Sequence, residues 1–94
     1  MNQEYKIAQG DNRFYMSDEQ NLIGEITYFE NEDGQLVVDH TFVNPQYRGK
    51  NIGMILINAI VEYARNINKL IIPVCPYVEK MFSRNSKFED IWFK

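Results

Sequence analysis

Apolar and polar residues alternate along the first half of the chain, as they do in strands that bury one face. Short polar turns divide this half, and one of them contains the Asp33-Gly34 pair typical of a turn between antiparallel strands. The pattern predicts an antiparallel meander of four strands, at residues 4–9, 13–17, 22–29 and 35–43.

The spacing of apolar residues changes to three and four after residue 51, which predicts one long amphipathic helix over residues 52–67. Residues 70–74 are continuously apolar, which predicts a fifth strand, buried on both faces, beside the fourth. Pro76 can occupy the first turn of a short C-terminal helix. The apolar tail, residues 88–93, is expected to dock on the core. The sequence therefore predicts an α+β fold with a long central helix.

The length and composition of the chain indicate a single soluble domain covering residues 1–94. The sequence is 45% apolar and 24% charged, and its mean hydropathy is -0.42. No apolar run approaches the roughly 20 residues that span a bilayer, and the chain begins without the pattern of a secretory signal. The single cysteine, Cys75, excludes an internal disulfide and fits a reducing compartment. We therefore expect a cytoplasmic protein, a monomer or weak dimer, with no membrane partner.

The formal net charge of -3 argues against extensive contact with a nucleic-acid backbone, because such binding rests on many lysine and arginine contacts. A local cluster of cations can still bind one phosphate group. We expect no nucleic-acid partner and no metal ion.

Residues 48–53 read Arg-Gly-Lys-Asn-Ile-Gly and lie between the fourth strand and the long helix. Successive N–H groups at the start of a helix, reinforced by the helix dipole, bind anions. Gly49 and Gly53 allow the backbone to approach an anion closely, and Arg48 and Lys50 add positive charge. The segment lacks the Gly-Lys-Ser/Thr ending of a Walker loop, and it follows four strands, unlike a dinucleotide fingerprint. We expect a diphosphate site; the alternative is a glycine turn before a core helix.

Residues 43–53 resemble the acetyl-CoA motif of the Gcn5-related N-acetyltransferases, Gln/Arg-x-x-Gly-x-Gly/Ala, which opens the cofactor-binding helix of that family. The wider match is to small bacterial and plant members of about this length, and it runs from about residue 5 to the end of the chain. The motifs that carry it are His40-Thr41, Arg48-Gly49, Tyr63-Ala64-Arg65 and Cys75-Pro76-Tyr77. Asn51 stands where the family has a glycine. Asparagine adopts left-handed backbone more readily than other non-glycine residues, so the loop geometry can survive while its side chain weakens diphosphate binding.

The resemblance implies a truncated form of the family's fold that binds acetyl-CoA or coenzyme A. The residues it implies for the diphosphate are Arg48, Gly49, Lys50, Asn51, Ile52 and Gly53. The pantetheine arm would follow the backbone near Phe42 and Val43. The implied activity is transfer of the acetyl group to an unidentified amine acceptor, which could be a protein. The alternatives are a non-catalytic acyl-CoA-binding module and a small protein-interaction domain.

His40 and Cys75 are the candidate catalytic residues, because the resemblance places the thioester near both. Histidine is the usual general base near neutral pH, and a cysteine thiolate can accept an acyl group. The alternation of Val38 and His40 also allows a hydrogen-bonded core histidine, with Asp39 on the opposite face. Cys75 can equally be a small apolar core residue. Tyr77 is expected to pack against the protein rather than to contact substrate.

Overall fold

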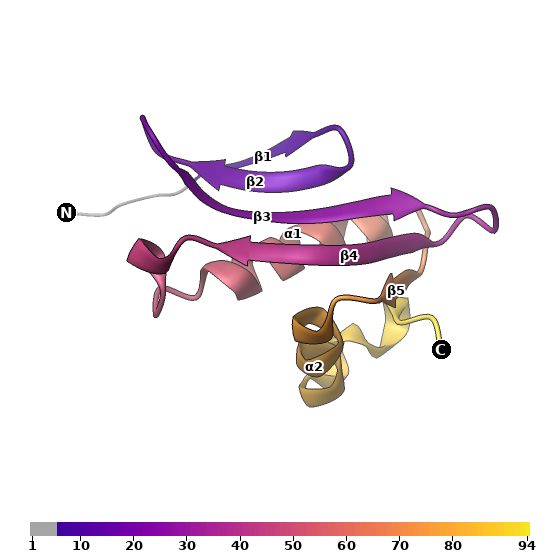
Figure 1. The fold of residues 1–94 in the computed structure, drawn as a ribbon. Helices are drawn as coiled ribbons and strands as arrows, with labels where there is room; N and C mark the ends of the chain where they lie inside the picture. The colour runs from indigo at the N-terminus through magenta and orange to yellow at the C-terminus, as the bar shows by residue number, and fades with distance from the viewer. Residues whose placement is uncertain (1–5) are drawn as a thin grey trace.

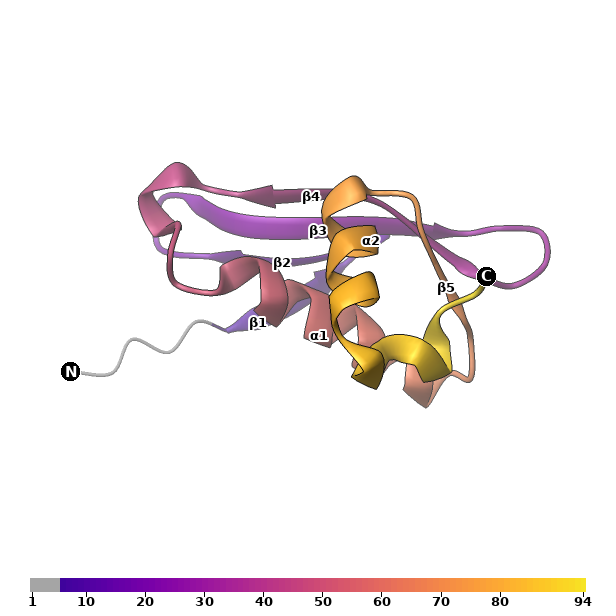
Figure 2. The same ribbon diagram turned by 90° about the horizontal axis from the view of Figure 1, so that it is seen from below.

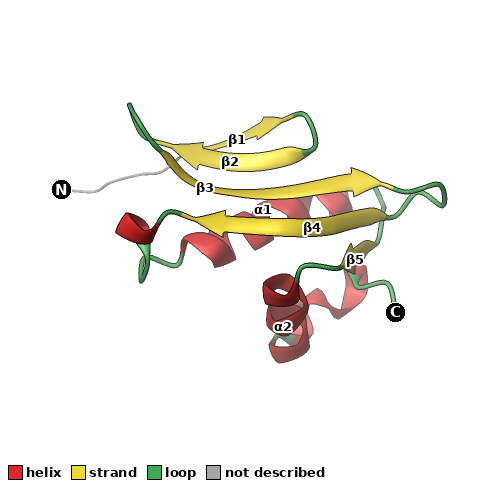
Figure 3. Cartoon of the chain, viewed as in Figure 1, coloured by secondary structure: helices red, strands yellow, loops and turns green. Residues whose placement is uncertain are grey.

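The computed structural model describes residues 6–94, so positions 4 and 5 of the first predicted strand lie outside the described residues. The described chain forms one five-stranded sheet with two α-helices and two 3-10 helices (Figures 1 and 3). The strands are β1 (Ile7–Gly10), β2 (Arg13–Ser17), β3 (Leu22–Glu30), β4 (Leu36–Val43) and β5 (Ile71–Pro73). The helices are η1 (Pro45–Tyr47), α1 (Ile52–Asn66), α2 (Pro76–Arg84) and η2 (Ser86–Ile91).

The sheet has the order β1-β2-β3-β4-β5. Strands β1 to β4 pair as an antiparallel meander, and β5 pairs in parallel with β4. Helix α1 forms the crossover between β4 and β5, which a parallel neighbour requires. The predicted α+β fold, with a long helix and a fifth strand beside the fourth, is confirmed.

Strand β5 is shorter than the apolar run that predicted it. Ile71 is fully buried and Pro73 is buried, but Leu70 is 39% exposed and Val74 is 58% exposed. The expectation that the whole run is buried on both faces is therefore wrong at its ends. Because β5 pairs only with Leu36, Val37 and Val38, residues 39–43 of β4 continue without a β5 partner.

A β-bulge interrupts β4 at Asp39. Val38 pairs with Tyr28 of β3. Thr27, the neighbour of Tyr28, pairs with His40, which leaves Asp39 as the extra residue of β4. Residues directly opposite each other in an antiparallel pair share a face, so His40 lies on the face of Thr27 rather than on that of Val38 and Tyr28. The expected alternation of Val38 and His40 on one face is therefore wrong.

The bulge turns a different part of β4 toward the helices. Thr41 pairs with Ile26, a fully buried core residue, and Val43 pairs with Gly24, where an added Cβ would lie 3.0 Å from the Ile52 side chain and 3.1 Å from the Leu56 side chain of α1. Thr41 and Val43 therefore face α1.

One hydrophobic core joins the sheet to the helices. Helix α1 packs along one face of the sheet, and α2 begins beside β4 and runs toward the same side (Figure 2). Leu56, Ile60 and Ala64 of α1 are fully buried, as the three- and four-residue spacing predicts. The described helices leave the other face of the sheet uncovered (Figure 1). No helix within residues 6–94 has the length and hydrophobicity that a membrane span requires.

The C-terminal tail docks on the core, as predicted. Phe88 and Ile91 are buried. Trp92 forms a parallel bridge with Ile71, and the Phe93 N–H donates to the Ile71 carbonyl at 2.8 Å. The tail thus covers the far edge of β5 at its start.

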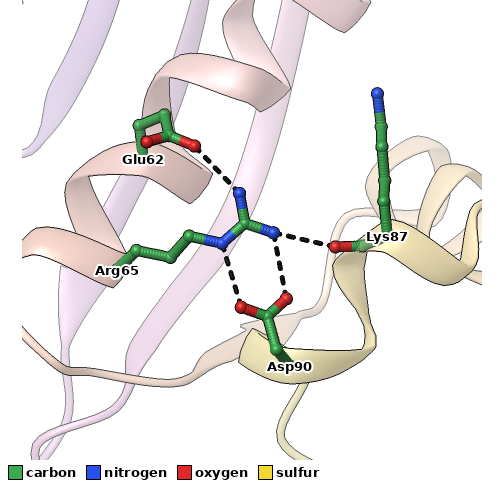
Figure 4. A network of polar contacts seen from close by, with 4 residues as sticks. All are labelled: Glu62, Arg65, Lys87 and Asp90. Atoms are coloured by element: carbon green, nitrogen blue, oxygen red, sulfur yellow. Dashed lines mark hydrogen bonds and ion pairs between the residues drawn. The ribbon is translucent and has the colours of Figure 1, made fainter.

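Arg65 of α1 binds this tail to the helix through hydrogen bonds (Figure 4). Its Nε and Nη2 atoms donate to the two carboxylate oxygens of Asp90 at 3.0 and 2.9 Å. Nη2 also donates to the Lys87 carbonyl at 2.8 Å, and Nη1 donates to Glu62 at 2.8 Å. The arginine of the Tyr63-Ala64-Arg65 motif therefore has a structural role between α1 and η2.

Candidate functional site

A cleft of about 500 Å³ opens where β4 ends and α1 begins. Strand β4, the connecting loop and both helices contribute to its walls. The lining residues are Thr41, Val43, Tyr47, Arg48, Gly49, Asn51, Ile52, Gly53 and Tyr77. Most of the segment that the sequence predicts as a diphosphate site therefore lies on one cleft.

Left-handed backbone at two positions shapes the loop of this cleft. Gly49 has φ +82°, and among residues 6–94 no atom outside its immediate neighbours lies within 4 Å of the place where a Cβ would stand. Asn51 has φ 64° and ψ 25° and forms the N-cap of α1. The expectation that asparagine preserves the left-handed geometry at this position is confirmed.

The first N–H groups of α1 are free to bind a ligand. Asn51 makes no side-chain capping bond, and the first turn contains no acidic residue. The first backbone bond of the helix runs from the Ile55 N–H to the Asn51 carbonyl. Within residues 6–94, no acceptor pairs with the N–H groups of residues 49–54. Unpaired amides at the positive end of a helix dipole bind anions, and the Arg48 side chain lines the same cleft.

Cys75 lies behind the inner end of the cleft. Its N–H and that of Val74 both donate to the Val38 carbonyl at 3.0 Å, at the point where β4 and β5 diverge. Its thiol is 3.5 Å from the hydroxyl of Thr41, within hydrogen-bonding distance, and the residue is only 7% exposed. Thr41 lines the cleft and Cys75 does not, so the cysteine contacts a residue of the cleft wall without lining the cleft itself.

Tyr77 packs against the start of α1. Its ring atoms Cε2 and Cζ lie 2.9 Å from the place where a Cβ at position 53 would stand, so Gly53 is required for this contact. Burial raises the pKa of the Tyr77 phenol, and the nearby Cys75 raises it further. Tyr77 is therefore a protonated hydroxyl at neutral pH on the wall of the cleft.

Four residues predicted for the site lie outside the cleft lining: Cys75, His40, Phe42 and Lys50. His40 is exposed on the face away from α1, so the alternative of a buried core histidine is wrong. Asp39 accepts a hydrogen bond at 2.6 Å from Thr27, the direct partner of His40, so its expected place on the opposite face from His40 is also wrong. Phe42 is 36% exposed on the His40 face, and Lys50 is exposed beyond the cleft.

Two aromatic residues of the cleft, Tyr47 and Tyr77, were not expected there from the sequence. Tyr77 had a usable signal, because the proline before it starts α2 and fixes a side chain near the helix N-terminus. Tyr47 directly precedes the predicted diphosphate segment, which is the only sequence signal for its position.

Comparisons with known proteins agree on one family. A family model described as GCN5-related N-acetyl-transferase matches residues 13–91. The solution NMR structure of a GCN5-like candidate N-acetyltransferase from Staphylococcus aureus is 35% identical with a TM-score of 0.80, over 94% of this chain and 87% of that chain. No curated protein sequence matches significantly.

A more distant protein shares the fold alone. The crystal structure of ribosomal-protein-alanine N-acetyltransferase from Brucella melitensis biovar Abortus 2308 has a TM-score of 0.58 at 23% identity. The match covers 77% of this chain and 58% of that chain, so it spans less than two thirds of the Brucella protein.

Proposed function

This chain belongs to the GCN5-related N-acetyltransferase family, and from that premise we propose that it binds acetyl-CoA in the cleft and transfers the acetyl group to an amine. The observation that carries the proposal is the set of unpaired N–H groups over residues 49–54 at the N-terminus of α1, a segment from which Gly49, Asn51, Ile52 and Gly53 line the cleft. A diphosphate matches this arrangement in charge and in hydrogen-bonding capacity.

The residues of the loop fit the diphosphate of coenzyme A. Gly49 leaves open space beside the backbone, and the Arg48 side chain can pair with a phosphate oxygen. We place Ile52 and Gly53 as amide donors of the first helical turn. Lys50 lies outside the lining, so its contribution is a longer-range attraction.

The open edge of β4 fits the pantetheine arm. Beyond Val38 this edge has no β5 partner, so it presents main-chain donors and acceptors to the gap beside α2. We propose that main-chain groups near Phe42 and Val43 bind the amides of the arm. The thioester then lies near Thr41 and Cys75.

Acetyl-CoA supplies an acetyl group that is already activated as a thioester. A main-chain N–H on the open edge of β4 can stabilise negative charge that develops on the carbonyl oxygen. The Tyr77 phenol is protonated and lines the cleft, so it can donate its proton to the departing thiolate.

We propose His40 as the base that deprotonates the attacking amine, and Cys75 as the alternative acyl acceptor. His40 is exposed on the uncovered face of the sheet, so an amine that it serves approaches from that face. An uncovered face admits a large acceptor, such as a lysine or the N-terminus of a protein.

A non-catalytic acyl-CoA-binding module is the second candidate function. It is favoured by the position of His40, which lies on the opposite face from the residues that line the cleft. The two functions share the cofactor site and differ in whether an acetyl group is transferred.

Calorimetry with acetyl-CoA, coenzyme A and adenosine tests the shared site. We expect the two coenzymes to bind and adenosine not to bind, with weaker binding in Arg48→Ala and unchanged binding in Arg84→Ala, an exposed cation of α2. If the folded wild-type protein shows no binding of coenzyme A at millimolar concentration, the proposal is wrong.

Thiol release from acetyl-CoA in the presence of a panel of peptide amines then separates transfer from binding. Loss of release in His40→Ala or Cys75→Ala, with coenzyme binding retained, identifies the residue that takes part. Binding without release in the wild type favours the non-catalytic module.

A further inference from the structure

The turn between β2 and β3 is fastened to the segment that leads into the diphosphate loop. The Asn44 N–H donates to the Ile23 carbonyl at 2.8 Å, and the Asn44 side-chain amide donates to the Leu22 carbonyl at 3.1 Å. The Tyr47 hydroxyl donates to a carboxylate oxygen of Asp18. Residues 18–23 and 44–47 are thus joined at both ends of η1.

Asp18 is held in place by its own turn before it meets Tyr47. Its Oδ1 atom accepts from the N–H groups of Gln20 at 2.8 Å and Asn21 at 2.7 Å, and Oδ2 remains for the tyrosine. The hydrogen bond from Tyr47 lowers the pKa of the Asp18 carboxyl, and the two backbone amides lower it further. The acceptor is therefore an ionised carboxylate in a fixed orientation at neutral pH.

Tyr47 carries this restraint to the cleft. It is the last residue of η1, it is half-buried, and it lines the cleft together with Arg48. Asp18 is exposed and does not line that cleft. Its route to the cofactor site therefore runs through Tyr47.

We propose that Asp18 is a positioning residue for the diphosphate loop, holding η1 through Tyr47 so that the unpaired amides of residues 49–53 keep their arrangement without ligand. The inference rests on the proposed function for its effect on coenzyme binding. The physical reason is preorganisation: a loop already held in its binding conformation loses less conformational entropy when the ligand arrives.

Asp18→Asn is the informative variant. The side-chain oxygen of asparagine can keep the turn by accepting from Gln20 and Asn21, but its amide nitrogen can only donate to the Tyr47 oxygen, so the charge-assisted bond from the Tyr47 hydroxyl to a carboxylate is lost and at most a weaker neutral bond remains. Tyr47→Phe removes the same bond from the other side. Glu19→Gln is the matched control, because it removes one exposed charge from the same turn.

Two measurements test the proposal. The first is amide hydrogen exchange over residues 45–53 in the absence of ligand, where we expect faster exchange in Asp18→Asn and Tyr47→Phe than in the wild type and Glu19→Gln. The second is the Kd for coenzyme A by calorimetry, where we expect a weakening of about fivefold in both variants, the scale of one exposed charge-assisted contact. The double variant should bind no more weakly than either single variant. In a transfer assay the change appears in KM for acetyl-CoA, with kcat unchanged.

The outcomes separate this inference from the proposed function. If the wild type does not bind coenzyme A but amide exchange in the loop is faster in Asp18→Asn, the proposed function is wrong and the structural restraint on the loop is still supported. If exchange in the loop is unchanged in Asp18→Asn, or rises equally in Glu19→Gln, the positioning role is overturned whatever coenzyme A does. Faster exchange with unchanged Kd also overturns it.

Discussion

Asn51 shows at the scale of one residue how the loop keeps a left-handed turn without the family's glycine. Its φ of 64° lies in a region that costs most residues roughly 1–2 kcal/mol and costs asparagine less. The side chain makes no capping bond, so the backbone conformation is its structural contribution. The left-handed preference of asparagine was visible in the sequence, because it belongs to the residue type alone.

Substitutions of Asn51 should distinguish the effect of its left-handed backbone conformation from the effect of its side chain. Asn51→Ala is expected to lower the free energy of unfolding by about 1 kcal/mol, because alanine is strained at this φ. Asn51→Gly should keep stability within about 0.5 kcal/mol of the wild type and bind coenzyme A more tightly, because it removes the side chain from the cleft wall. Urea unfolding and calorimetry measure the two effects. Equal stability of the alanine and glycine variants would contradict the conformational argument.

Gly53→Ala tests the contact between α1 and Tyr77. A Cβ at position 53 collides with the tyrosine ring, so Tyr77 must leave its place on the cleft wall. Alanine also favours the helix by up to about 1 kcal/mol, so we expect little loss of stability and a fall of about tenfold or more in kcat/KM. Steady-state kinetics with urea unfolding measures the pair of effects.

The double variant provides the control for this prediction. If Gly53→Ala acts by displacing Tyr77, it should have little further effect in a Tyr77→Ala background. Additive losses would mean that Gly53 serves the ligand directly. The sequence indicated Gly53 as a position where the backbone approaches an anion closely. It could not indicate the contact with Tyr77, because residues 53 and 77 are far apart in the chain and are brought together by the tertiary fold.

At the scale of elements, the strands and helices could be predicted from the spacing of apolar residues, but the bulge in β4 could not. Leu36, Val38 and His40 fit a regular alternation in the sequence, and nothing in residue type marks Asp39 as an extra residue. The bulge depends on how β4 pairs with β3, which is a tertiary property. Its consequence is for the cleft, because the bulge places Thr41 on the cleft wall and His40 on the other face of the sheet.

The contribution of the Arg65–Asp90 contact between α1 and η2 to stability should depend on pH, because Asp90 is a titratable carboxyl. The hydrogen bonds from Arg65 hold the pKa of the Asp90 carboxyl below its ordinary value. A carboxyl whose pKa is lower in the folded state stabilises the fold above its unfolded pKa, near 3.9, and loses this effect as pH falls through the folded value. Asp90→Asn should therefore cost about 1 kcal/mol at pH 7, a modest figure because the side chain is 57% exposed, and almost nothing near pH 2.

Urea unfolding at both pH values measures the Asp90 effect. Glu89→Gln, the exposed neighbour in η2, is the control and should change stability little at either pH. If Asp90→Asn lowers the free energy of unfolding by the same amount at pH 7 and pH 2, the contact between Arg65 and Asp90 does not stabilise the fold through the charge of Asp90.

At the scale of the molecule, the cleft brings together elements that are distant in sequence. Strand β4, the loop after η1, the start of α1 and the start of α2 each supply part of its wall. The order of these elements could be predicted, since strand, loop, helix and strand follow one another in the chain. The divergence of β4 from β5 could not, because it requires knowing that β5 ends at Pro73 while β4 continues.

A ligand that bridges these elements should stabilise the whole domain. At a concentration of acetyl-CoA 100 times its Kd, binding to the folded state alone adds about 2.7 kcal/mol to the free energy of unfolding. For a domain of 94 residues this corresponds to a rise in Tm of about 10–20 °C. Arg48→Ala should show a smaller rise at the same concentration, because its Kd is weaker, whereas Arg84→Ala should match the wild type. Adenosine lacks the diphosphate and should leave Tm unchanged. An equal rise with adenosine and with acetyl-CoA would place the binding energy outside the α1 amides, and the assignment of the cleft to a diphosphate would then be wrong.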